Sequence, residues 1–302
     1  MTAPQPGIFA QGTRAHYYLE YDLQPNASPD AVLRALRSLR EPPVTAGGAN
    51  LVLAFSRRLW QQLSPDDAPP QLRHFDAVKG PAGTAPATQH DIWLWTHGTN
   101  SDVVVDVARA ATVALGPVAK LAHEQPAFVY QESRDFLGFV DGTENPPVWE
   151  AHLAAIVPDG ETGAGGSFVL TQKWVHDLGR FEELPDDEQE RVFGRTKQDS
   201  EELDDDVRPA DSHISRVVIE DDDGDEVEIY RRSTPWGTVT EQGLMFVAFS
   251  NDLTTYDRML ARMFGTSGDG THDRVTDFST PVSGAYYFAP SLADLYGVFG
   301  KI

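Results

Sequence analysis

The chain of 302 residues contains no cysteine. Disulfides, thiolate nucleophiles, iron–sulfur clusters, zinc–cysteine sites and thiolate-ligated haem are therefore all excluded. Any metal must be held by histidine, carboxylate, tyrosine or methionine side chains.

Long apolar runs are also missing. A helix that crosses a bilayer needs about 20 largely apolar residues, and no stretch of the sequence approaches that length. Residues 1–9 lack the basic region and apolar run of a secretory signal. We therefore expect a cytoplasmic protein that does not enter the membrane.

Positive charge is scarce, with 24 Lys and Arg against 46 Asp and Glu and a formal net charge of −22. The resulting negative field repels the phosphates of nucleic acids and anionic lipids. We therefore expect no nucleic-acid partner.

One acidic run, Asp221–Glu226, invites comparison with a calcium loop. If Gly224 takes the sixth position of an EF-hand, the first and twelfth ligands fall on Ile219 and Tyr230, which cannot serve. The run is better interpreted as a hairpin turn.

The first half of the chain alternates strand and helix patterns. Ser28 before Pro29 has the features of an N-cap followed by a first helical turn. The expected strands are 16–23, 51–56, 90–96 and 127–132, and the expected helices are 28–39 and 102–115.

The second half repeats this order of elements. The expected strands are 166–175, 216–220, 227–231, 243–250 and 285–288, and the expected helices are 185–193 and 253–264. The first half follows the order strand, helix, strand, strand, helix, strand, and the second half repeats it with one additional strand, 227–231, that pairs back. This order predicts an α+β protein of two ferredoxin-like halves, each an antiparallel sheet with helices packed on it, as in a dimeric α+β barrel. We place the halves at 1–150 and 151–302.

The segment Gly138-Phe-Val-Asp-Gly-Thr-Glu-Asn-Pro146 is polar and rich in turn residues. Asp141 follows an apolar strand end and precedes a glycine that permits close backbone approach, which suits a carboxylate projecting into a pocket. The alternative is an ordinary Asp-Gly turn, and local sequence leaves both open.

A second polar segment, 194–200, is followed by Asp211-Ser-His-Ile-Ser-Arg216. His213 precedes the apolar run 217–219. A histidine at a strand entrance can be a haem ligand or an ordinary surface or core residue, and spacing alone does not decide.

These segments, with Gly194-Arg-Thr-Lys197, Tyr230-Arg-Arg-Ser233-x-Pro-Trp-Gly237 and Gly284-Ala-Tyr-Tyr-Phe-Ala-Pro290, resemble the dye-decolourising peroxidases of the compact bacterial B subfamily. The resemblance runs in order from about residue 14 to the end of the chain. The Gly-x-x-Asp-Gly element is short, whereas five segments in sequence are specific.

The resemblance implies a haem-dependent peroxidase with one haem b per chain. It makes Asp141 the distal acid–base, His213 the iron ligand and Arg231 the distal cation. Ser233 is implied beside the distal water, and Asp277 as the acceptor for the second nitrogen of His213. Arg231 would also favour ionised Asp141. Activity is expected to extend to acid pH, because a carboxylate base stays ionised where a distal histidine would be protonated.

Only one of two adjacent arginines can enter the pocket, because neighbouring side chains of a strand face opposite sides. The family pattern leaves one residue between the distal arginine and the polar Ser233. That spacing selects Arg231 over Arg232.

The implied partners are hydrogen peroxide and small-molecule electron donors such as bulky dyes and phenolic compounds. Mn(II) oxidation is a further hypothesis, because Glu144 lies beside the distal motif. A homo-oligomer is implied, and a role as encapsulin cargo is not expected because the chain ends soon after the closing motif. The competing hypotheses are a haem-handling protein with little turnover and an acidic interaction protein without a cofactor.

Overall fold

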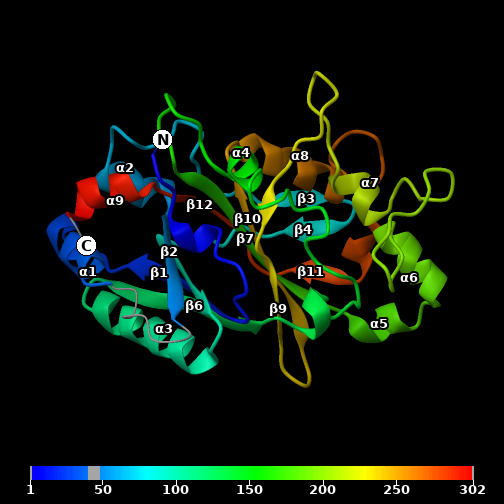
Figure 1. Cartoon of the computed structure of the whole chain (residues 1–302), viewed down its shortest axis with the longest axis horizontal. Helices are drawn as coiled ribbons and strands as arrows, with labels where there is room; N and C mark the ends of the chain where they lie inside the picture. The colour runs from blue at the N-terminus through cyan, green and yellow to red at the C-terminus, as the bar shows by residue number, and fades with distance from the viewer. Residues whose placement is uncertain (1, 40–47, 301–302) are drawn as a thin grey trace.

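The computed structural model describes residues 2–39 and 48–300. Within them, ten strands form one antiparallel sheet that runs through the molecule (Figure 1), and β3 and β4 form a separate ribbon. The strands are β1 (Ala15–Leu23), β2 (Ala49–Phe55), β3 (Val78–Gly80), β4 (Gly83–Ala85), β5 (Ile92–Gly98), β6 (Ala119–Phe128), β7 (Ser167–His176), β8 (Tyr230–Arg231), β9 (Thr234–Gly237), β10 (Gln242–Ser250), β11 (Ser279–Pro281) and β12 (Ala285–Ala289).

The order of the strands confirms the predicted fold class. The main path is β6-β1-β5-β2-β12-β7-β10-β8. Its first four strands and its last four each follow the pattern fourth, first, third, second in chain order, which is the ferredoxin-like arrangement. The division at residue 150 stays a prediction.

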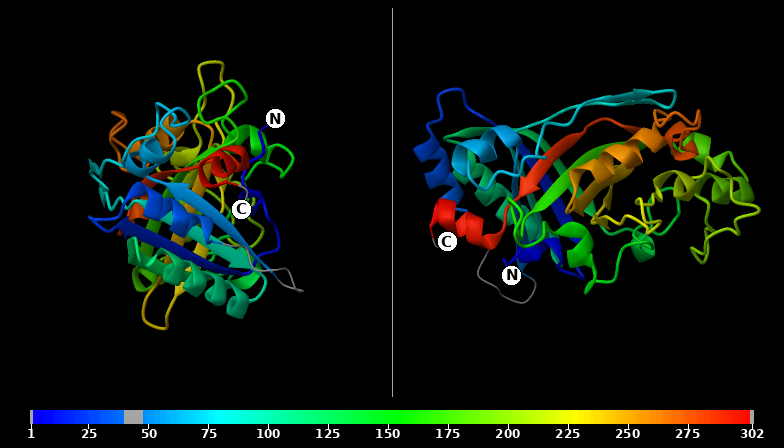
Figure 2. Two further views of the ribbon diagram at one scale, coloured as in Figure 1. Left: turned by 90° about the vertical axis from the view of Figure 1, so that its left-hand side faces the viewer. Right: turned by 90° about the horizontal axis from the view of Figure 1, so that it is seen from above.

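Helices lie toward both ends of the molecule and also over its middle (Figure 1), and the molecule is elongated (Figure 2). The α-helices are α1 (Pro29–Arg37), α2 (Arg57–Leu63), α3 (Ser101–Leu115), α4 (Ala151–Ala155), α5 (Leu178–Glu182), α6 (Asp186–Phe193), α7 (His213–Val217), α8 (Leu253–Met263) and α9 (Leu292–Phe299). Short 3-10 helices are η1 (Pro6–Ile8), η2 (Gln131–Ser133) and η3 (Arg274–Asp277). Within the described residues, no helix has the length and apolar character needed to cross a membrane.

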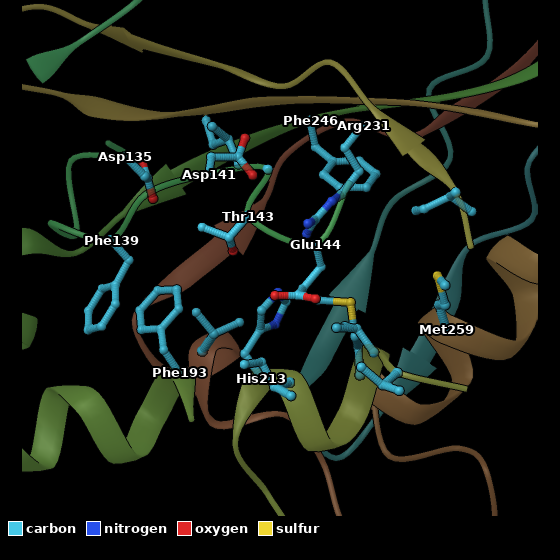
Figure 3. Close-up of a pocket in the computed structure, with 18 of the residues that line it drawn as sticks. Asp135, Phe139, Asp141, Thr143, Glu144, Phe193, His213, Arg231, Phe246 and Met259 are labelled. Atoms are coloured by element: carbon cyan, nitrogen blue, oxygen red, sulfur yellow. The ribbon is translucent and has the colours of Figure 1, made fainter. Parts of the chain in front are cut away.

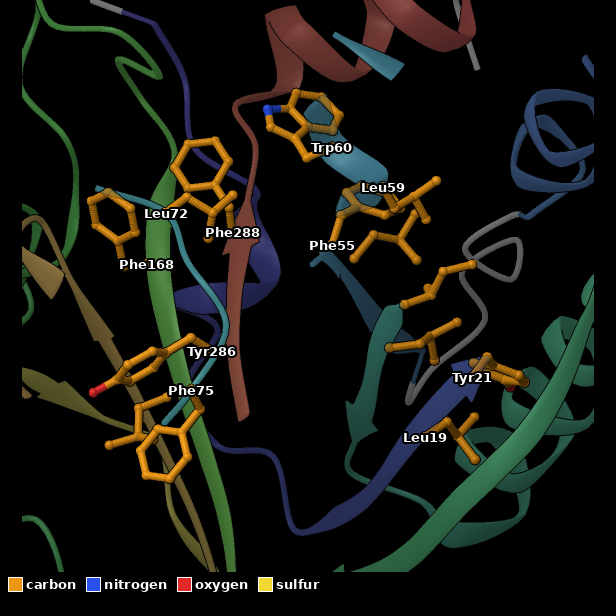
Figure 4. Close-up of a cluster of buried hydrophobic side chains, with 14 of the residues drawn as sticks. Leu19, Tyr21, Phe55, Leu59, Trp60, Leu72, Phe75, Phe168, Tyr286 and Phe288 are labelled. Atoms are coloured by element: carbon orange, nitrogen blue, oxygen red, sulfur yellow. The ribbon is translucent and has the colours of Figure 1, made fainter. Parts of the chain in front are cut away.

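The two halves share one hydrophobic core (Figure 4). Phe288 of β12 pairs with Phe55 of β2 across the junction. The Phe288 ring lies 5.5 Å from that of Phe168 and 6.3 Å from that of Trp60. Because both halves bury side chains in this cluster, close packing fixes the position of one half against the other.

The predicted strand 216–220 is wrong. Residues His213–Val217 form helix α7, whose N-cap Ser212 accepts a hydrogen bond from the amide of Ser215. The apolar run 217–219 suggested a strand, but the Ser212 cap and packing against α8 favour a helical turn.

Two further strand predictions have the wrong bounds. Strand β6 begins at Ala119 instead of 127. It is an edge strand, and the polar residues Lys120, His123, Glu124 and Gln125 hide the apolar alternation by which a strand is recognised. Strand β8 is restricted to Tyr230–Arg231. The turn predicted in the acidic run is confirmed, because a Glu220–Glu226 bridge brackets it.

A buried carboxyl lies in β1, away from the functional segments. Glu20 is 2% exposed and accepts a hydrogen bond from the hydroxyl of Tyr287 at 3.1 Å. Burial raises the pKa of Glu20 to about 7, although His90 at 3.8 Å opposes this rise. The folded protein therefore binds a proton here more tightly than the unfolded chain does.

Replacing Glu20 with glutamine should stabilise the protein at pH 8 and change little at pH 4. Since the folded pKa of Glu20 is raised, its stabilising contribution is complete below about 4.5 and is lost as the pH rises through about 7. Glutamine keeps an acceptor for Tyr287 and removes the charge, so we expect a gain of roughly 2–3 kcal/mol at pH 8. Urea unfolding at both pH values measures it, with exposed Glu183→Gln as control. Equal gains at both pH values would contradict the assignment.

Candidate active site

A large cavity lies between β7, β10, α7, α8 and the loop 135–144 (Figure 3). It encloses about 1470 Å³ counted out to its open mouth. Apolar side chains dominate its walls, among them Phe139, Leu170, Phe193, Phe246, Met259 and Met263. Such a cavity suits a large and mostly apolar group.

His213 lies on one wall as the first residue of α7, with its ring directed into the cavity (Figure 3). Its Nδ1 is 2.7 Å from Oδ2 of Asp273, which is completely buried. An ionised carboxylate can only accept a hydrogen bond, so Nδ1 carries the proton. This pairing leaves the Nε2 lone pair of His213 available to a metal.

The prediction that Asp277 is the partner of His213 is wrong. Asp277 Oδ1 lies 3.3 Å from Nε2 of His272 instead, and its side chain is 40% exposed. Asp273 is the N-cap of η3 and also accepts a hydrogen bond from the amide of Val275. Asp273, at the start of this short helix, points into the interior, whereas Asp277, at its end, lies at the surface.

Asp141 and Arg231 line the other side of the cavity, opposite His213 (Figure 3). Burial raises the pKa of Asp141 above its usual value, and the charge of Asp135 raises it further. The positive charge of Arg231 lowers it, and so does a hydrogen bond from the backbone of Gly142, but burial outweighs both. Asp141 therefore becomes protonated at a higher pH than an exposed aspartate.

The two adjacent arginines face opposite sides of their strand, as the alternation predicts. Arg231 enters the cavity, whereas the guanidinium of Arg232 donates to the carbonyls of Ile8 and Ala10 at 2.6 and 2.8 Å. It also lies 5.2 Å from the ring of Trp95. The role of Arg232 is therefore to join the N-terminal segment to the sheet.

Ser233 lies in a second, more polar cavity that Asp141 and Arg231 also line. Its buried Oγ has no hydrogen-bond partner among the described residues. A buried hydroxyl in this condition is usually satisfied by water or a ligand. Ser233 is thus placed where a small polar molecule can reach Asp141.

Several polar residues of the site escaped the sequence analysis. Nε2 of His176 is 3.0 Å from Asp135 Oδ1, and its Nδ1 is 2.8 Å from Ser279 Oγ. Neither residue has a motif around it that could have revealed the pair. Arg195, which does lie in the Gly194-Arg-Thr-Lys197 segment, pairs with Glu144 and with Glu202.

The cavity and its walls define a class of protein, an enzyme that binds a large apolar cofactor through one histidine and faces it with an acid and a cation. The family profile described as "Dyp-type peroxidase, N-terminal" matches residues 5–128, and "Dyp-type peroxidase, C-terminal" matches residues 132–294. The chain belongs to the Dyp-type peroxidase family. It is therefore a haem peroxidase, an oxidoreductase that uses peroxide.

Individual relatives agree with the family. The chain is similar to a dye-decolorizing peroxidase of Rhodococcus erythropolis, with 38% identity over 82% of this chain and 74% of the relative. A solved DypB variant of Rhodococcus jostii in complex with haem is 34% identical over 98% of this chain and 99% of that chain, with a TM-score of 0.92. A DypB variant in complex with manganese is 32% identical over 94% and 96%, with a TM-score of 0.87.

The residues present fit a haem group. Nε2 of His213 is available on one wall, and the other walls are largely apolar. The buried Nε2 of Gln172, also on the wall, finds no hydrogen-bond partner within the described residues. A donor without a partner in an apolar cavity is expected where a ligand supplies the acceptor.

Proposed function

We propose that His213 holds one haem b per chain through Nε2, and that Asp141, Arg231 and Ser233 act on hydrogen peroxide from the opposite wall. The observation that carries this assignment is the geometry of His213, whose Nδ1 is occupied by buried Asp273 while its ring faces Asp141 and Arg231 across the cavity. A haem held there by neutral His213 would supply the electrons that reduce peroxide.

Asp141 acts as the acid–base of the reaction. Its carboxylate takes a proton from one oxygen of peroxide and returns it to the other oxygen. The oxygen that receives this proton leaves as water. Arg231 stabilises the negative charge that develops as the O–O bond breaks. The free Oγ of Ser233 provides a hydrogen-bonding group for peroxide or water as it approaches Asp141.

The proposed electron donors are bulky dyes and phenolic compounds. Oxidation of Mn(II) is a second candidate, supported by Glu144 and Glu226 on the wall of the cavity. Burial and the charges of neighbouring glutamates raise the pKa of Glu226, which indicates concentrated negative charge. However, no group of three His, Asp or Glu residues within 2–39 and 48–300 is arranged to hold a metal ion, so dyes and phenols come first.

Turnover separates this proposal from a haem-handling protein. We would follow the visible spectrum of the haem-loaded protein after one equivalent of peroxide, and then add a dye or Mn(II). A fast spectral change that the dye reverses supports the peroxidase. An unchanged spectrum with intact haem would favour the carrier.

The cytoplasmic location, the homo-oligomer and the absence of encapsulation stay predictions.

The rate of the peroxide reaction should fall on the acid side of a raised Asp141 pKa. Because the base must be ionised, the protein loses activity as the pH falls through that pKa, which burial and Asp135 hold above the usual aspartate value. Asp135→Asn removes a negative charge and should move this acid limb to lower pH. Stopped-flow rates between pH 3 and 8 measure the shift, and a limb that moves to higher pH would contradict this account.

A further inference from the structure

One side chain ties the turn that carries Asp141 to the strand that carries Arg231. Oδ1 of Asn145 accepts a hydrogen bond from the backbone amide of Arg231 at 2.8 Å. Nδ2 of Asn145 donates to the backbone carbonyl of Arg231, also at 2.8 Å. A single amide therefore satisfies both backbone polar groups of the arginine.

This contact takes the place of a missing strand. Strand β8 is two residues long and lies at the end of the sheet, and Arg231 pairs there with Ala248 of β10. The amide of the next residue, Arg232, donates to Val247 of β10 at 2.7 Å. Since backbone groups of an antiparallel strand alternate in direction, those of Arg231 face away from β10. Asn145 occupies them as a neighbouring strand would.

The other end of the contact is the turn that presents Asp141. The backbone N–H of Asn145 donates to the carbonyl of Gly142 at 3.2 Å, and this hydrogen bond closes the turn. Gly142 has φ +81°, and a Cβ there would lie 3.2 Å from Nδ2 of Asn145. The turn is also anchored upstream, because the amide of Asp141 donates to the carbonyl of Ser133 at 3.0 Å.

We infer that Asn145 is a positioning residue that sets the separation of the Asp141 carboxylate and the Arg231 guanidinium. The inference rests on the proposed roles of Asp141 and Arg231. The two groups come from chain segments that are distant in the sequence, since Asn145 and Arg231 are 86 positions apart. Without the side-chain amide of Asn145, strand β8 keeps only its hydrogen bonds to β10. Arg231 is then free to move relative to Asp141.

The test compares Asn145→Ala in the native background and in an Arg231→Leu background. Displacing a reacting group by about 1 Å can cost on the order of 100-fold in rate, so we expect a 10- to 100-fold lower second-order rate with peroxide. In the Arg231→Leu background the same change should have no further effect, because Asn145 acts through Arg231. The haem content should stay at the native level. Asn251→Ala, which removes a donor to Leu153 at 2.6 Å outside the cavity, is the matched control.

Hydrogen–deuterium exchange of the haem-free protein gives a readout that does not depend on activity. The amide of residue 231 should exchange faster in Asn145→Ala than in the native protein or in Asn251→Ala. Asn145→Asp retains the Oδ1 acceptor, loses the Nδ2 donor and should show intermediate exchange, which keeps the test usable if the alanine variant folds poorly.

Either of two results overturns the inference. One is a native peroxide rate in Asn145→Ala, and the other is an equal loss of rate in the Arg231→Leu background. If Arg231→Leu itself leaves the rate unchanged, the proposed function of Arg231 fails instead. If Arg231→Leu has the native rate and Asn145→Ala still shows faster exchange at residue 231, the contact between Asn145 and Arg231 exists but has no catalytic consequence. The positioning role would then be rejected.

Discussion

Replacing His213 with alanine should leave the purified protein with little or no haem. Asp273 fixes the proton of His213 on Nδ1, and this leaves Nε2 of the ring available to bind a metal in the cavity. Losing a partner of a metal ligand commonly lowers affinity by about 10- to 100-fold, and losing the ligand itself should cost more. We therefore expect Asp273→Asn to weaken haem retention and His213→Ala to lower it by more than about 100-fold.

The Soret absorbance of protein purified from haem-supplemented cells, and the rate of haem transfer to an acceptor globin, measure this effect. His74→Ala, which removes an exposed histidine outside the cavity, serves as the control. Native haem retention in His213→Ala would exclude this residue as the iron ligand. The cavity would then have to hold haem by its apolar walls alone.

The second large effect is expected at Asp141. Asp141→Asn preserves the shape of the side chain and removes the base, which typically contributes 10²- to 10⁴-fold to proton-transfer steps. Arg231→Leu should lower the rate by about 10²- to 10³-fold, the usual loss when a group that stabilises developing charge is removed. Both variants should keep their haem, because neither residue is on the His213 wall.

Stopped-flow mixing with peroxide measures these rates directly. Asp222→Asn, in the exposed hairpin turn, removes a carboxylate without touching the cavity and is the control. If Asp141→Asn reacts with peroxide at the native rate, Asp141 is not the acid–base. If both variants and the native protein are equally slow, the haem-handling hypothesis is favoured.

The raised pKa of Asp141 changes one expectation drawn from the sequence. Arg231 was expected to keep Asp141 ionised at acid pH, and its charge does act in that direction. Burial is the larger influence, and a linear sequence contains no measure of how deeply a side chain is buried. The acid limit of activity is thus a property of the folded pocket.

Local patterns were sufficient for most of the fold. Ser28 caps α1 as predicted, and the apolar run of 243–250 is strand β10, which pairs with strands on both sides. Repetition of one element order also predicted two ferredoxin-like halves correctly. The error at α7 arose because Val217 and its neighbours suit a strand as well as a helix, and only the Ser212 cap and α8 resolve that choice.

The sequence by itself determined the family, the fold class and three of the side chains that face the cavity, His213, Asp141 and Arg231, because these depend on short motifs in a fixed order and on local periodicity. Only the tertiary structure decided that Asp273 and not Asp277 holds His213, and that Asn145 binds both backbone groups of Arg231. These contacts join residues 60 and 86 positions apart. Contacts of that kind depend on how elements pack, and no local propensity encodes which of two nearby carboxylates meets a distant ring.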